Sequence, residues 1–149
     1  MKLVRRLLLV LHSFVGVGAL AGGLAAIIDP YEPMGITVEA LKHSPFNDFL
    51  IPGIILFTVI GLGNILSAIT LWNDFKYQGY ISSVFSWALV IWIVVQCIML
   101  QGIVALHIIY LIIGLVEAIL SAIILFKQGL FPADVIMGLV KKQSKQKVL

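Results

Sequence analysis

The sequence predicts an all-α membrane protein, a four-transmembrane-helix antiparallel bundle. Of its 149 residues, 61% are hydrophobic and 11% are charged, whereas about 25% charged residues is usual in soluble domains. Four apolar stretches are each long enough to cross a hydrocarbon core, which takes roughly 20 residues of helix. Because backbone groups have no water partner in lipid, we expect every stretch to be helical.

The expected spans cover about residues 7–28, 50–72, 80–100 and 103–126, within one membrane domain of residues 1–149. The first span imitates a signal peptide, with a basic start, an apolar run and small residues at Ala19 to Ala21. The apolar run continues to Ile28 and is too long for a typical signal core. We therefore expect this segment to be retained as a span.

The distribution of lysine and arginine predicts the orientation. The net charge of +3 is carried mainly by the two chain ends, whereas the first connection, residues 29–49, has one lysine and four acidic residues. Both termini are thus predicted to be cytoplasmic and the long connection to lie outside the cell membrane. The other two connections are short, which favours antiparallel neighbouring helices.

The C-terminal segment has a proline, Pro132, where a further helix would begin, and its last ten residues, 140–149, are rich in lysine. This pattern predicts a short interfacial helix followed by a basic tail. Anionic lipid is the expected partner of that tail. The placement of the basic residues favours membrane contact over nucleic acid.

Several classes of function find no support in the sequence. Cys97 is the only cysteine, so a disulfide or a CxxC redox pair within the chain is excluded. The sequence contains no P-loop, no dinucleotide-binding glycine motif and no HExxH motif. His12 and His107 are expected about 19 Å apart in depth, too far for a haem pair. We predict no metal site and no cofactor.

Three polar residues in the spans are expected to converge. Glu117 lies near the middle of the last span, where a carboxylate costs at least about 2.5 kcal/mol to insert. Helical rise places Asn64 at nearly the same depth and His12 slightly deeper towards the cytoplasmic side. These groups could hold a polar or cationic ligand head, relay a proton, or form a satisfied network between helices.

The outer half of the bundle offers further polar groups. Trp92 lies one turn from Gln96, and Tyr110 shares a helical face with Glu117. We interpret His107 as a packing or interface histidine. The candidate ligand-binding residues are Glu117 as counter-ion, together with Asn64, His12, Trp92 and Tyr110.

The stretch HSPFNDFLIPG, residues 43–53, predicts a helix start before the second span. Ser44 is a suitable N-cap and Pro45 fits the first helical position. Pro52 and Gly53 follow, where a helix would bend. We therefore expect a short interfacial helix, a kink and then the span.

The connection around this stretch is expected to be ordered and to lie over the outer mouth of the bundle. Thr37 is a suitable cap for a short helix over VEALK. His43 and Asp48 lie on the outer side and could shape the entrance to a cavity.

The motif SPFNDFLIPG, together with GVGALAGGLAAIIDP at the end of the first span, resembles a group of small bacterial four-helix membrane proteins with an SPFxDFxIPG loop. It resembles the DoxX-like proteins more loosely. The closer resemblance covers the first half of the chain and implies the four-helix fold without an activity. The looser one implies a link to quinone-linked oxidoreductases and transfers no residue.

Two functions follow as hypotheses. In the first, the protein binds or transports a lipophilic or cationic small molecule in a cavity near Glu117. In the second, it is a structural or accessory subunit of a larger membrane complex, such as a DoxX-like oxidoreductase, or a homo-oligomer. Enzymatic activity is less favoured, because no nucleophile pairs with a base at a recognisable spacing.

Overall fold

The computed structural model describes residues 1–129 and 135–138. These residues contain helices and no strand. The elements in order are α1 (Lys2–Ile28), the 3-10 helices η1 (Pro33–Gly35) and η2 (Val38–Leu41), α2 (Leu50–Ile55), the π-helix η3 (Leu56–Leu62), α3 (Gly63–Trp72), α4 (Gln78–Leu100) and α5 (Ala105–Gln128).

Within the described residues, four helices are long and apolar enough to cross a membrane: Lys2–Ile28, Leu50–Trp72, Gln78–Leu100 and Ala105–Gln128. The prediction of four apolar helices is thereby confirmed. The first begins earlier than expected, because its basic start is already helical. Residues 135–138 are helical, but the rest of the predicted C-terminal helix and the basic tail lie outside the described residues.

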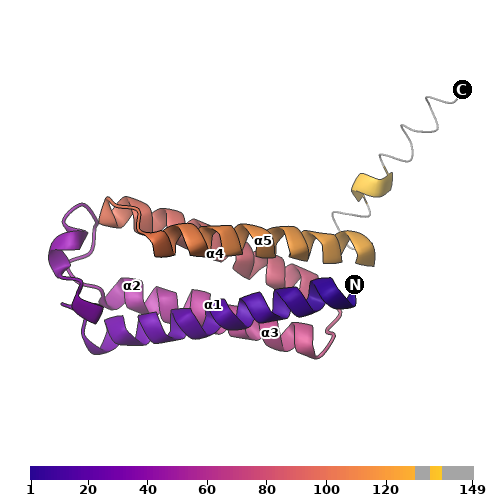
Figure 1. Ribbon diagram of the computed structural model, residues 1–149, viewed down its shortest axis with the longest axis horizontal. Helices are drawn as coiled ribbons and strands as arrows, with labels where there is room; N and C mark the ends of the chain where they lie inside the picture. Colours follow the sequence, from indigo (N-terminus) through magenta and orange to yellow (C-terminus); the bar gives the residue numbers. More distant parts are fainter. Residues whose placement is uncertain (130–134, 139–149) are drawn as a thin grey trace, which may run out of the picture.

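The long helices lie side by side in two pairs (Figure 1). Helix α4 packs along α5, and α1 packs along the continuous helix formed by α2, η3 and α3. The pairs meet where α3 contacts α4 and α1 contacts α5. We call the end with residues 29–49 and 101–104 the loop end, and the opposite end, with Met1 and residues 73–77, the N-terminal end (Figure 1).

Glycines allow α1 and the second span to approach closely. A Cβ atom on Gly23 would lie 2.6 Å from the backbone nitrogen of Phe57, and one on Gly61 would lie 2.8 Å from the side chain of Leu20. Small residues have this role between helices in lipid, where close backbone approach increases packing contacts. Gly22, by contrast, faces only the side chain of Leu56, at an ordinary 3.5 Å.

The helix start predicted at Ser44 is wrong. The Ser44 hydroxyl accepts the backbone N–H of Phe46 in a local turn at 3.2 Å, and α2 begins only at Leu50. Asp48 Oδ1 accepts the Leu50 N–H at 3.0 Å. The aspartate turn directly before the apolar run thus determines where the helix begins, and Pro45 lies outside it.

The kink predicted at Pro52 and Gly53 is also wrong, because α2 begins only two residues before Pro52 and no preceding interfacial helix is joined there. Pro52 is the third residue of α2, where its missing N–H leaves no hydrogen bond unmade. A Cβ on Gly53 would lie 2.7 Å from that of Ala26, so this glycine serves close packing. The irregular part of the second span is η3, further along the helix.

A polar contact joins the helices at the N-terminal end. Arg5 of α1 lies 2.6 Å from the Asp74 carboxylate, which also accepts a hydrogen bond from the Gln78 amide at 2.9 Å. The Gln78 hydrogen bond and then the Arg5 guanidinium hold the pKa of Asp74 below its ordinary value of 3.8. Because this pair is solvent-exposed, its contribution to stability is small.

Candidate functional site

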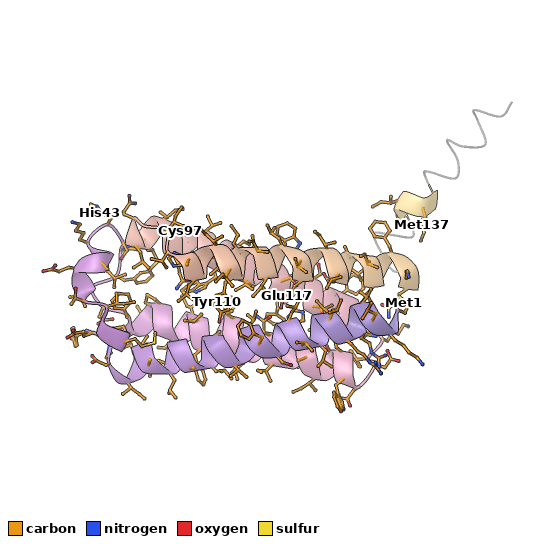
Figure 2. All side chains as sticks on the ribbon, in the orientation of Figure 1. Met1, His43, Cys97, Tyr110, Glu117 and Met137 are labelled. Atoms are coloured by element: carbon orange, nitrogen blue, oxygen red, sulfur yellow. The ribbon has the colours of Figure 1, made fainter. Side chains whose placement is uncertain are left out.

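Three side chains from three helices meet in the interior of the bundle, and we call them the polar cluster: His12, Asn64 and Glu117. His12 Nδ1 lies 2.6 Å from Asn64 Oδ1 and 3.3 Å from Glu117 Oε1. All three residues are fully buried. The prediction that they converge is confirmed. Figure 2 shows Glu117 between α5 and α1.

Hydrogen bonding fixes the roles of two members of the cluster. Asn64 donates from Nδ2 to the backbone oxygen of Ile60 at 2.8 Å, so its Oδ1 is the acceptor and His12 Nδ1 carries a proton. Within the described residues, neither Glu117 oxygen has a partner with hydrogen-bond geometry. An isolated buried charge is far more costly than a pair, so the His12 and Glu117 side chains should be net neutral together.

The register of α4 against α5 follows from two glycines. Gly114 of α5 lies against Val90 and Leu89 of α4, and Gly79 of α4 lies against Leu125 and Ile124 of α5. In an antiparallel pair these two contacts determine which residues are level with each other.

This register places Ser86 within about one residue of the level of Glu117, and Ser82 within about one residue of the level of Ser121. All three serines are fully buried. Ser86 and Ser121 donate their hydroxyls to backbone oxygens of their own helices, at 2.6 and 2.9 Å. His12 is thus the ion-pair neighbour of Glu117 in the described residues, whereas His12 Nε2, Ser82 Oγ and both Glu117 oxygens are buried without a hydrogen-bond partner there.

A separate cavity of about 630 Å³ lies nearer the loop end, and we call it the outer cavity. Its lining is predominantly apolar and comes from α1, the η1–η2 connection, η3, α4 and α5. The lining residues include Val15, Gly22, Ile60, Leu89, Trp92, Gln96, His107 and Tyr110.

The predicted single site is divided in two by the structure. Trp92 and Tyr110 line the outer cavity, whereas the three members of the polar cluster do not. A buried apolar layer separates the two regions and consists of Val15, Ile60 and Leu89, each at most 2% exposed. Glu117 thus lies outside the outer cavity, and its assignment as a ligand counter-ion stays a prediction.

The outer cavity has one polar wall and one apolar wall. The register above places Gln96 level with His107, and Trp92 within about one residue of Tyr110. All four line the cavity from α4 and α5. The side chains from α1 and η3 that face them are apolar. His107, interpreted from the sequence as a packing residue, thus belongs to the cavity lining.

The first connection covers the outer cavity with apolar side chains. Met34, Ile36 and Ala40 belong to its lining, and the first two are exposed at its rim. His43 and Asp48, predicted to shape the entrance, are not among the lining residues. His43 is exposed at the loop end (Figure 2) and Asp48 binds the start of α2. The signal available in the sequence was the apolar character of Met34 and Ile36 in the first connection.

No protein-family model, curated protein or solved structure matches the chain. Within residues 1–129 and 135–138, no group of three His, Cys, Asp or Glu side chains is placed to hold a metal ion.

Proposed function

We propose that the protein is a multi-span membrane protein that binds a lipophilic small molecule in the outer cavity. The observation that carries this proposal is the cavity itself. Its volume of about 630 Å³ lies within the 300–1,000 Å³ typical of small-molecule sites, and such sites combine apolar walls with a few placed polar groups. The four polar side chains on α4 and α5 provide that combination.

Binding is supported more directly than transport. A transported molecule would have to pass the layer formed by Val15, Ile60 and Leu89, which is closed in this structure. A cationic ligand is less favoured than a neutral one, because the cavity-lining side chains of the described residues include no acid.

Filling the outer cavity should abolish binding. Gly22→Phe places a ring in the cavity, since a Cβ at this position meets only Leu56 at 3.5 Å. We expect benzophenone, photoactivated with the protein in lipid nanodiscs, to label cavity-lining peptides in the natural sequence and to fall to background in this variant. The measurement is mass spectrometry of the labelled peptides. Leu24→Phe, at a half-exposed position two residues away, is the matched control and should label normally. Equal labelling of all three proteins would refute the proposal.

A structural or accessory subunit is the second candidate. It is favoured by the closure of the polar cluster, in which Glu117 contacts His12 and is inaccessible. Such a cluster can hold helices together without any ligand. The partner would be a further membrane subunit, and for the basic tail we propose anionic lipid.

We further propose that the N-terminal end faces the cytoplasm, because basic residues gather there. In a Cys97→Ser background, a membrane-impermeant maleimide should label His43→Cys in intact cells. It should label Lys76→Cys only after permeabilisation. Both positions are exposed at opposite ends of the bundle, so the reverse pattern would invert the proposed orientation.

A further inference from the structure

The polar wall of the outer cavity presents hydrogen-bond donors. His107 Nδ1 accepts the backbone N–H of Val104 at 3.4 Å at the start of α5. A neutral imidazole that accepts at one nitrogen carries its proton on the other. His107 therefore offers an Nε2–H as a donor, and its side chain lines the cavity.

The neighbouring groups add donors at two depths. Gln96, level with His107, has an amide NH₂. Deeper in the cavity, the Tyr110 ring is stacked on Phe14 with centroids 6.0 Å apart, and its hydroxyl lies beside Gly18 of α1. Trp92 is 7% exposed and its indole N–H, a pure donor, is buried without a hydrogen-bond partner in the described part of the chain.

From this arrangement we infer that the occupant is a lipophile that carries a carbonyl oxygen on one edge. The carbonyl accepts hydrogen bonds from the α4–α5 wall, and the hydrocarbon part lies against α1 and η3. An amine has no matching acid among the lining residues, and a pure hydrocarbon offers no acceptor to the donors of His107, Gln96 and Tyr110. This inference rests on the proposed function and specifies its ligand class.

Two rigid probes of the same shape test the inference: fluorenone, which has a carbonyl, and fluorene, which lacks it. Each is used to compete with benzophenone photolabelling of the full-length protein in nanodiscs. The double variant Gln96→Met/His107→Phe removes donors while keeping side-chain size. We expect it to weaken competition by fluorenone about tenfold, the effect of one or two net hydrogen bonds, and to leave competition by fluorene unchanged.

Tyr110→Phe is a milder second variant that removes one hydroxyl, and we expect about a threefold loss for fluorenone alone. Tyr77→Phe, at an exposed position outside the cavity, is its matched control. Competition by fluorene reports that the cavity of each variant is intact. If the variants change both probes equally or neither, the inference is overturned while the proposed function stands. If neither probe competes in the natural sequence, the proposed function itself fails.

The carbonyl could belong to a free lipophile or to the ester of a phospholipid. Nanodiscs of ester-linked and ether-linked phospholipids distinguish these sources. If fluorenone competes less well in ester-linked than in ether-linked lipid, and this difference disappears in Gln96→Met/His107→Phe, the inference is supported. The occupant is then a phospholipid ester. If fluorenone competes equally well in both lipids and still competes less well in Gln96→Met/His107→Phe, the inference is also supported. The occupant is then a free lipophile.

Discussion

Replacing His12 by leucine is expected to destabilise the protein by about 3 kcal/mol, because it leaves the Glu117 carboxyl buried beside an apolar side chain. The loss of the His12 hydrogen bond to Asn64 Oδ1 adds to this effect. The measurement is the free energy of unfolding in mixed detergent micelles. Val10→Leu, on the exposed face of the same helix, is the control and should change stability little.

The double variant His12→Leu/Glu117→Leu should recover most of the lost stability, since replacing both members of a buried pair by apolar residues is often neutral. Benzophenone binding by this double variant then shows whether the polar cluster has only a structural role or also contributes to ligand binding. A stable double variant that still binds benzophenone in the outer cavity would make the polar cluster purely structural. A stable variant that no longer binds would couple the cluster to the cavity across the Val15, Ile60 and Leu89 layer. If His12→Leu is no more costly than Val10→Leu, the cluster does not hold the helices together.

Gly23→Ala is expected to lower the free energy of unfolding by about 3 kcal/mol, at the upper end of the range for overpacking. The new Cβ would lie 2.6 Å from the backbone nitrogen and 2.8 Å from the Cα of Phe57, and a backbone cannot move as a flexible side chain does. The helices would have to separate along the α1–η3 contact.

Gly22→Ala is the matched control for this substitution. Both variants gain the same roughly 1 kcal/mol of helix propensity, but the Cβ at Gly22 is at an ordinary 3.5 Å from Leu56. The difference between the two variants therefore measures the close approach alone. Equal thermal and detergent stability of the two proteins would show that α1 and η3 are not in close contact at Gly23.

The helices and the polar cluster could be predicted because both depend on regular quantities. Hydropathy and length identify the spans, and the constant rise of a helix places His12, Asn64 and Glu117 at similar depths. The helix start could not be predicted with the same certainty, because Ser44 and Asp48 both offer side-chain oxygens that can bind backbone N–H groups. The structure shows that Asp48, nearer the apolar run, binds the first turn.

The outer cavity could not be predicted because it depends on the spaces between helices. Trp92 and Tyr110 share helical faces with Gln96 and Glu117, but a face does not show whether it meets a neighbouring side chain or a void. The layer that separates Tyr110 from Glu117 contains ordinary apolar residues such as Val15 and Ile60, which carry no signal in the sequence. The π-helical segment η3, on the opposite wall, likewise consists of mostly apolar residues that do not distinguish it from an α-helix in the sequence.

The exposed apolar rim of the outer cavity has a consequence for how affinity is expressed. Met34, Ile36, Val104 and Leu106 line the outer cavity and are exposed and apolar, so the proposed lipophile would reach them from the bilayer in which it is dissolved. Its effective concentration is then its mole fraction in lipid. An apparent dissociation constant in water would contain the partition coefficient of the ligand, so two ligands of equal intrinsic affinity would differ by the ratio of their partitioning.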